Sequence, residues 1–393
     1  MMAMEPIAVL EVGTSRTRVF VGEDGPDGGL QVAGMAEVRS GGIQKGEVIH
    51  GEAAAQSIVR AVEDAQRALE MDINDVQLAV NGAGVEGLPH REEMAVEGAV
   101  DDDDVDRLAK QVPDNVAGAG RENVQSVAGQ FLVDGLRVSE PQGMAARTLA
   151  LDLLILHGQR PRLMNLIQTV KQAGLAVKSL QFGGVASAMA VTDAESRKNG
   201  VLVIDVGAGT TDYAAYANGQ LVDGGALPVG GGHVTSDICR AFRVVQEEGE
   251  ALKIEHGGAM VCATQRTQRL TLRSGGRVKT TDLQAVIHLR MEETFRLVRE
   301  RLQRRNLTKY FGDGVVLTGG GAKLNGAATL AQEVFGLPCR VGVPLLAASA
   351  GERYAREEYA TGLGGLACAY QREWQRQAHG ETWLDKVRKF IGW

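Results

Sequence analysis

The sequence predicts a duplicated α/β fold whose two halves face each other across a central cleft. Two segments carry this prediction, VLEVGTSRTRVFV at 9–21 and VLVIDVGAGTTDYAAY at 201–216. Each runs from an apolar strand pattern through a carboxylate and a glycine turn into a second strand pattern. Glu11 aligns with Asp205 and Gly13 with Gly207, both pairs 194 positions apart, which is about half of the 393-residue chain.

The two turns have the chemistry of a phosphate clamp. Gly207 and Gly209 permit a tight turn whose backbone N–H groups can approach an anion. Two such hairpins facing each other can hold a phosphate chain from both sides, with Glu11 and Asp205 holding hydrated Mg²⁺. The alternative is a pair of tight hairpins without a ligand. A Rossmann loop needs GxGxxG leading into a helix and a Walker A loop needs GxxxxGK[ST], and the sequence has neither arrangement.

A third glycine turn follows another strand in VVLTGGGAKLNGAATLAQEVFG at 315–336. The pattern predicts a strand at Val315–Leu317, a turn at Gly319–Gly321 and a helix at Ala327–Phe335. A glycine turn between a strand and a helix allows a flat base or ribose to pack against the backbone.

Composition limits the class of protein. At 44% apolar and 23% charged residues, the chain has the composition of an ordinary globular protein. A net charge of -7 argues against a nucleic-acid partner. Four scattered cysteines without zinc spacing favour a reducing cytoplasm, and we expect neither an export signal nor a membrane-spanning helix.

Together the three turn segments resemble the phosphate-1, phosphate-2 and adenosine motifs of the superfamily of actin, DnaK chaperones and sugar kinases. Four further segments narrow the resemblance to the bacterial cell-division family FtsA. They are SGGIQKGEVI (40–49), the stretch from SVAGQFLVDG to EPQGM (126–144), ALPVGGGHVTSDI (226–238) and EALKIEHGGA (250–259). The resemblance implies an actin-like, ribonuclease H-like duplicated fold with a central nucleotide cleft, an FtsA-type inserted domain 1C and a C-terminal amphipathic helix.

The resemblance also implies ATP and Mg²⁺ as ligands and assigns residues to them. Phosphate contacts fall to Gly13, Thr14, Ser15 and Arg16 on one side and to Gly207, Gly209, Thr210 and Thr211 on the other. Ribose and base contacts fall to Glu250, Lys253, Gly319, Gly320, Gly321 and Lys323. Without the resemblance, Glu250 and Lys253 would be expected to form a solvated ion pair on a helix face.

One departure from the superfamily pattern concerns hydrolysis. Many members carry Glu or Gln where QFGGVASAMAV (181–191) places Gly183, and this side chain positions the attacking water. A missing water-positioning group impairs hydrolysis far more than binding. We therefore expect ATP to act mainly as a structural and polymerisation ligand with slow turnover, and we assign no catalytic residue beyond Glu11 and Asp205.

The resemblance implies an order of subdomains along the chain. The first half consists of domain 1A, at 1–85, 165–200 and 344–370, and the inserted domain 1C, at 86–164. The second half consists of domain 2A, at 201–240 and 313–343, and subdomain 2B, at 241–312. A linker at 371–382 and the amphipathic helix at 383–393 end the chain. Within 1C, the acidic run Asp101–Asp104 is expected to cap a helix, and His157 is expected to be structural.

Subdomain 2B contains a predicted long helix at 281–307. Its apolar stripe is Leu283, Val286, Ile287, Met291, Thr294 and Leu297, and its other face carries Arg290, Arg296, Arg299, Arg301, Arg304 and Arg305. On the sequence alone this second face is a solvated basic face. The resemblance makes 2B the receptor of the apolar and acidic C-terminal tail of FtsZ.

The final residues have the pattern of a membrane-binding helix. At 100° per residue, Trp383, Leu384, Val387, Phe390 and Ile391 share an arc of about 120°, opposite Lys386, Arg388 and Lys389. Trp393 ends the segment. Such a helix suits an anionic lipid surface, although a helix packed on the protein is the alternative.

The combined expectation is an FtsA-like protein that binds ATP, polymerises on the inner face of the cytoplasmic membrane and tethers the FtsZ ring there. It would be a peripheral protein at the division site, with later division proteins as further partners through 1C. The alternatives are a PilM-like or MreB-like adaptor or filament and an actin-fold small-molecule kinase. For a kinase, we find no stretch that aims a catalytic Asp at a substrate hydroxyl.

Overall fold

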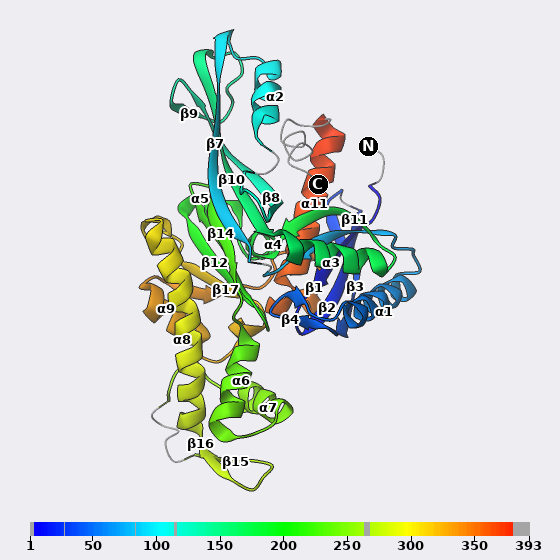
Figure 1. Ribbon diagram of the computed structural model, residues 1–393, viewed down its shortest axis with the longest axis vertical. Helices are drawn as coiled ribbons and strands as arrows, with labels where there is room; N and C mark the ends of the chain where they lie inside the picture. The colour runs from blue at the N-terminus through cyan, green and yellow to red at the C-terminus, as the bar shows by residue number, and fades with distance from the viewer. Residues whose placement is uncertain (1–3, 27, 83, 114–115, 263–267, 380–393) are drawn as a thin grey trace.

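Two sheets with the same strand order form the centre of the computed structural model, which describes residues 4–26, 28–82, 84–113, 116–262 and 268–379 (Figure 1). The first sheet has the order β11-β6-β1-β2-β3, and part of the second has the order β18-β17-β12-β13-β14. In each, the first three strands are parallel and the next two are antiparallel. The predicted duplication is therefore confirmed.

The strands of the first sheet are β1 (Ile7–Val12), β2 (Arg16–Asp24), β3 (Leu30–Arg39), β6 (Asp75–Val80) and β11 (Ala176–Phe182). The corresponding strands of the second are β12 (Val201–Val206), β13 (Thr211–Ala217), β14 (Gln220–Leu227), β17 (Val315–Thr318) and β18 (Cys339–Val341). Short strands β4 (Ile43–Gln44) and β5 (Glu47–Val48) form a separate ribbon.

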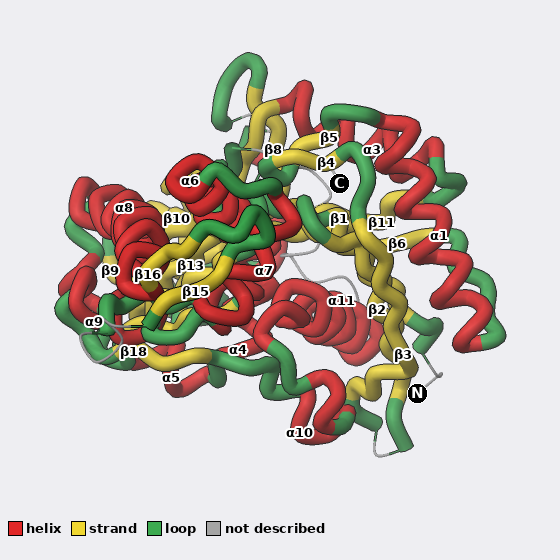
Figure 2. The backbone as a smooth tube through the Cα atoms, turned by 90° about the horizontal axis from the view of Figure 1, so that it is seen from below, coloured by secondary structure: helices red, strands yellow, loops and turns green. Residues whose placement is uncertain are grey.

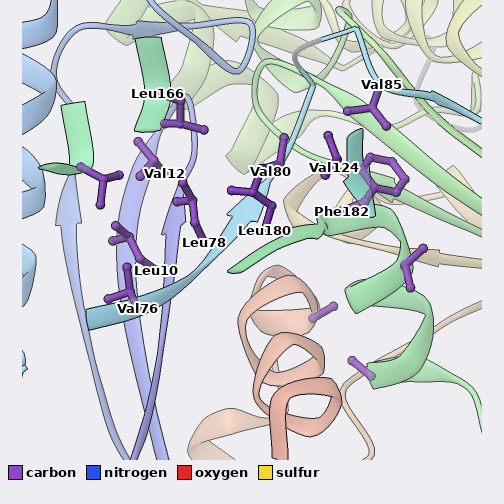
Figure 3. Packing of buried hydrophobic residues seen from close by; sticks show 14 of the residues in the cluster. Leu10, Val12, Val76, Leu78, Val80, Val85, Val124, Leu166, Leu180 and Phe182 are labelled. Atoms are coloured by element: carbon purple, nitrogen blue, oxygen red, sulfur yellow. The ribbon is translucent and has the colours of Figure 1, made fainter. Parts of the chain in front are cut away.

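Helices α1 (Gly51–Leu69) and α3 (Arg160–Gln172) cover one face of the first sheet, and α11 (Ala360–His379) covers the other (Figure 2). Helix α1 forms because buried apolar residues recur every three to four positions and the His50 side chain accepts the Ala53 N–H at its start. Leu10, Leu78 and Leu180 fill the space between the sheet and helices α1 and α3 (Figure 3).

Helix α4 (Gly183–Val191) packs against α11 and against the second sheet. The two helices therefore form the layer between the duplicated halves. Gly364 of α11 and Ala186 of α4 are in direct contact, because a Cβ on Gly364 would lie 1.8 Å from the Ala186 carbonyl oxygen. The halves can thus approach each other closely at this helix pair.

An inserted domain lies at one end of the molecule (Figure 1). It consists of β7 (Glu86–Ala99), α2 (Asp102–Gln111), β8 (Arg121–Val133), β9 (Leu136–Val138) and β10 (Ala145–Gln159). Its strands continue the second sheet beyond β14, joined by the single pair Gly225 and Glu86. Because it has its own core around Leu108, Leu149 and Ile155, it is a separate packing unit.

The predicted cap of the acidic run is confirmed. The Asp101 carboxylate accepts the Asp104 N–H at 2.8 Å, and the Asp104 carboxylate accepts the Asp101 N–H at 3.2 Å. This reciprocal capping box begins α2. His157 is buried in β10, as the sequence predicted for a structural residue.

The opposite end of the molecule contains α6 (Gly231–Phe242), α7 (Gln246–His256), β15 (Arg269–Thr271), β16 (Arg277–Lys279) and α8 (Thr280–Arg304) (Figure 1). The remaining elements are α5 (Ala194–Asn199), α9 (Ala327–Phe335), α10 (Ala347–Ala350), and the 3₁₀ turns η2 (Thr308–Tyr310), η3 (Gly320–Lys323), η4 (Glu352–Tyr354) and η5 (Glu357–Tyr359). No described helix has both the length and the hydrophobicity to span a bilayer.

The buried stripe of helix α8 differs from the stripe predicted for the helix at 281–307. Leu297 is 39% exposed, whereas Phe295 and Val298 are buried. The 3.6-residue period that runs through Ile287 and Met291 reaches position 298 rather than 297.

The predicted solvated arginine face is wrong in part. Arg299 donates to the Val334 carbonyl at 2.7 Å, Arg301 donates to the Ala226 carbonyl at 3.2 Å, and Arg305 donates to Asp223 at 2.8 Å. These guanidinium groups satisfy carbonyl and carboxylate groups of the elements that α8 packs against. Val334 lies in the last turn of α9, where helix carbonyls have no partner within the helix.

The predicted linker at 371–382 is also corrected. Helix α11 continues through His379, because QREWQRQAH contains good helix formers and no helix breaker. The ion pair between Arg376 and Glu373, at 3.2 Å, supports the extension. Residues 380–382 and the predicted amphipathic helix at 383–393 lie outside the described residues.

We predict that Arg305→Ala destabilises the protein, because it leaves the buried Asp223 carboxylate without its cation. Arg305 is 35% exposed and also donates to the Gly87 carbonyl of β7, so we expect a loss of about 1–3 kcal/mol in the free energy of unfolding. Chemical denaturation measures it. Arg304→Ala is the control, since Arg304 is 79% exposed and its nearest carboxylate is 4.0 Å away. Equal effects of the two variants contradict the prediction.

Candidate functional site

The two predicted turns are equivalent hairpins. In the first, Gly13 donates its N–H to the Arg16 carbonyl at 3.0 Å, and in the second Gly207 donates to the Thr210 carbonyl at 2.9 Å. The strands on either side pair antiparallel in the same register, β1 with β2 and β12 with β13. Sequence reasoning therefore placed both turns correctly.

The turns touch each other across the two halves of the fold. A Cβ on Gly209 would lie 2.2 Å from the Thr14 Oγ1 and 2.9 Å from the Lys45 Cα, so only glycine allows this approach. The Thr14 Oγ1 in turn accepts the Gly46 N–H at 2.9 Å. The structure thus brings Thr14, Gly209 and the 45–46 segment together at one point.

Cross-strand pairing fixes the charges beside each turn. In the first hairpin Glu11 is opposite Arg18, and in the second Asp205 is opposite Asp212. All four side chains are buried or nearly so. Like charges directly opposite each other destabilise a hairpin, so the Asp205–Asp212 pair is a feature that folding alone does not favour.

The pKa of Glu11 is raised to about 7, chiefly because burial penalises its charged form. Arg18, at 3.3 Å, lowers it, and the negative charge of Asp205 raises it further. Burial likewise raises the pKa of Asp205, although its carboxylate accepts hydrogen bonds from Ser187 at 2.5 Å and Thr361 at 3.1 Å.

Asp212 is the site residue that sequence reasoning missed. Its carboxylate accepts the Gly82 N–H at 3.1 Å and the Thr210 hydroxyl at 3.4 Å. Its pKa is raised well above the usual value, first by burial and then by Asp205. The signal was available, because residues 205 and 212 flank the four-residue turn symmetrically and must be cross-strand partners.

The donor set fits a cation held through water. Three buried carboxylates come from the two hairpins, and the negative charge of Asp205 raises the pKa of both Glu11 and Asp212. Among the described residues, no three His, Cys, Asp or Glu side chains converge as direct ligands of one metal ion. Mg²⁺ retains several waters and is commonly held by one or two carboxylates together with phosphate oxygens.

Two arginines of β2 lie near the first turn. Arg16 is 48% exposed and lies 3.9 Å from Glu37, at the edge of the hairpin. Arg18 is the arginine that lies beside the carboxylates, donating to Glu37 at 2.5 Å as well as to Glu11. Ser15 accepts the Ser40 N–H through its carbonyl at 3.1 Å, which ties the first turn to the end of β3.

Glu250 and Lys253 form the expected ion pair, and Lys253 also bonds to α6. Lys253 donates to Glu250 at 2.7 Å, to Thr235 at 2.9 Å and to the Gly231 carbonyl at 3.1 Å. Gly231 begins α6 and donates its N–H to the Gly207 carbonyl at 2.9 Å. The α6–α7 pair is therefore connected to the second turn.

The third turn packs on the second hairpin. A Cβ on Gly319 would lie 2.2 Å from the Asp205 Oδ1, whereas a Cβ on Gly320 would meet no atom within 4 Å. One side of this turn is thus open. Lys323 is not free, because it lies 2.5 Å from the half-buried carboxylate of Glu358. The predicted strand and helix around this turn are confirmed as β17 and α9.

Two family models match the chain. Residues 202–364 match the model described as cell division protein FtsA, and residues 82–157 match the model described as the SHS2 domain inserted in FtsA. The second match covers most of the inserted domain, from β7 through β10.

Full-length relatives are similar over nearly the whole chain. The cell division protein FtsA of Borreliella burgdorferi is 31% identical over 99% of this chain and 96% of its own length. That of Pseudomonas aeruginosa is 29% identical over 93% of this chain and 90% of its own length.

Solved structures with the same fold include the PilM–PilN type IV pilus biogenesis complex, with a TM-score of 0.64 and 16% identity over 93% of this chain and 98% of the other. MreB5 of Spiroplasma citri bound to ADP has a TM-score of 0.59 and 15% identity over 96% of this chain and 99% of the other. These likenesses, with the duplicated sheets and the inserted domain, confirm the predicted actin-like fold class.

Proposed function

The chain belongs to the FtsA family of cell-division proteins, and on this premise we propose that it binds ATP between the two turns and tethers FtsZ to the cytoplasmic membrane. The observation that carries the proposal is the pair of equivalent hairpins, each with a buried carboxylate two residues before the glycine that opens its turn. A hairpin that serves only as a connection has no need to bury like charges.

The nucleotide would lie with its phosphates between the turns. Gly13, Thr14 and Ser15 would hold it from one side, and Gly207, Gly209, Thr210 and Thr211 from the other. Bound Mg²⁺ would neutralise charge on the phosphates, with Glu11, Asp205 and Asp212 ordering its waters. MreB5, which has the same fold, binds ADP in its solved structure, and this supports a nucleotide as the ligand of this chain.

Nucleotide entry requires the two turns to separate. Because the Gly209 backbone lies against Thr14, no phosphate group fits between them at this contact. The base and ribose would pack at the open side of the third turn, next to Gly320. Lys253 and Glu250 then act by positioning α6 and the second turn, through the bonds from Lys253 to the Gly231 carbonyl and from Gly231 to Gly207.

Membrane attachment would come from residues 383–393, which begin four positions after His379, the last residue of α11, in the sequence. Five apolar side chains contribute at most about 1.5–3 kcal/mol each when fully buried, and burial at a lipid interface is partial. Ordering the segment costs about 1–2 kcal/mol per residue. One helix therefore binds weakly, whereas a filament that presents many binds far more tightly through effective concentration.

The FtsZ tail would dock on the α7–α8 end of the molecule. Most of the arginines of α8 have partners within the protein, so exposed apolar side chains are the free recognition groups there. Leu289 on α8 is 65% exposed and Ile254 on α7 is 72% exposed. Apolar residues of an extended or helical tail are the complementary chemistry.

We predict that Gly209→Ala weakens ATP binding at least tenfold. Its methyl group would project toward Thr14, into the space that the phosphates need. Equilibrium binding of ATP with Mg²⁺, measured by calorimetry, tests this. Gly29→Ala is the control, since a Cβ at Gly29 meets no atom within 4 Å and should leave the affinity unchanged. Unchanged affinity of Gly209→Ala, with a folded variant, argues against the clamp.

A second experiment tests the membrane function. With ATP, the wild type should sediment with anionic liposomes and bring FtsZ from the same organism into the pellet. Deletion of 381–393 or the variant Trp383→Glu should leave both proteins in the supernatant while ATP binding is retained. If the deletion still sediments, the anchor lies elsewhere. If the wild type sediments without FtsZ, the tethering proposal fails and the anchor stands.

A further inference from the structure

The side chain of Asn81 occupies the space that a side chain at position 183 would need. An ideal Cβ on Gly183 would lie 1.6 Å from the Asn81 Oδ1 and 2.7 Å from its Cγ. No rearrangement of a larger residue at 183 avoids this overlap while Asn81 stays in place. The two positions are therefore alternatives: either residue 183 or residue 81 can fill this volume.

The Asn81 Oδ1 is buried and accepts no hydrogen bond within the described part of the chain. Buried amide oxygens are nearly always paired, so an unpaired one calls for a partner from outside the protein. Gln181, 2% exposed on the neighbouring strand β11, likewise leaves its amide oxygen and nitrogen unpaired. In the pairing of β6 with β11, Gln181 is opposite Ala79, two positions before Asn81, so both unpaired amides belong to the carboxyl ends of adjacent parallel strands. Unpaired buried polar groups are the usual partners of buried water.

Asn81 lies next to the turns of the candidate site. Gly82, the residue after Asn81, donates its N–H to Asp212, and a Cβ on Gly82 would lie 2.7 Å from the Thr210 Cγ2. A Cβ on Gly46 would lie 2.7 Å from the Asn81 carbonyl oxygen and 2.9 Å from the same Thr210 methyl group. Asn81 is thus in the layer of side chains and backbone directly behind the second turn.

We propose that Asn81 is the water-positioning residue of this chain, supplying from the position after β6 the hydrogen-bond acceptor that Gly183 at the start of α4 cannot supply. The inference rests on the proposed binding of ATP between the turns. The Asn81 Oδ1 accepts a hydrogen bond from a water molecule and orients its oxygen toward the terminal phosphorus, as an acceptor side chain does in other phosphoryl transfers.

The step conserves atoms and charge. The water oxygen forms a new bond to the γ-phosphorus, and the bond from that phosphorus to the β,γ-bridging oxygen breaks and leaves ADP. The proton of the water passes to an oxygen of the departing phosphate, since a neutral amide accepts a hydrogen bond but does not take up a proton. Because an amide orients the water without acting as a base, turnover is slow, in agreement with the expectation from Gly183.

The test compares single-turnover hydrolysis with ATP affinity and thermal unfolding for the full-length protein. We expect Asn81→Ala, and Asn81→Leu as a variant of similar volume, to slow hydrolysis at least tenfold while ATP affinity stays within about threefold. The surface variant Asn199→Ala should match the wild type in all three measurements. Gly183→Gln alone should lower the unfolding temperature, since it collides with Asn81.

A double variant that moves the amide from position 81 to position 183 gives the most discriminating result. In Asn81→Ala combined with Gly183→Gln, the acceptor returns from α4, so hydrolysis and the unfolding temperature should both recover to near the wild-type values. Hydrolysis that is unaffected by loss of Asn81, or absent in the wild type over a day, overturns the inference. A combined variant that stays as slow as Asn81→Ala overturns it as well. Failure of the wild type to bind ATP overturns the proposed function instead.

Discussion

The burial of three carboxylates beside the two turns is the constraint on which the rest of the structure depends. Glu11 and Asp205 occupy equivalent positions of the duplicated fold, but Glu11 is opposite a cation and Asp205 is opposite another acid. Burial raises the pKa of all three acids, because it penalises their charged forms. A cation beside them would offset that cost, and Mg²⁺ brought with a phosphate chain is the cation that we propose for these oxygen donors.

The surrounding fold connects this site to the ends of the molecule. Helices α4 and α11 separate the two sheets, and Ser187 of α4 and Thr361 of α11 both donate to Asp205. Gly82 bonds to Asp212 and leads into β7, the first strand of the inserted domain. At the other boundary, Arg305 at the end of α8 joins Asp223 of β14 to Gly87 of β7. A change in the distance between the two turns would therefore move Gly82, which is bonded to Asp212 and leads into the inserted domain.

Sequence reasoning predicted the elements that depend on local pattern and failed where long-range pairing decides. The glycine turns, helix α9 and the α2 cap follow from residues within a few positions of one another. The position of Arg18 does not follow from local pattern, because only the register of β2 with β1 places it opposite Glu11. The α8 arginines looked solvated because their carbonyl and carboxylate partners are 35 to 82 positions away. No sequence pattern marked Asn81 as a site residue, because its side chain is brought against Gly183 only by the fold.

The affinity for ATP in the presence and absence of Mg²⁺ tests the central claim most directly. Three buried acids repel the phosphates of free ATP, and their repulsion is removed when Mg²⁺ lies between them. The account predicts that ATP binds in millimolar Mg²⁺ and that replacing Mg²⁺ with EDTA weakens binding by about tenfold or more, which corresponds to about 1.4 kcal/mol. Equal affinity under both conditions, or no binding with Mg²⁺, would contradict a site organised around these carboxylates.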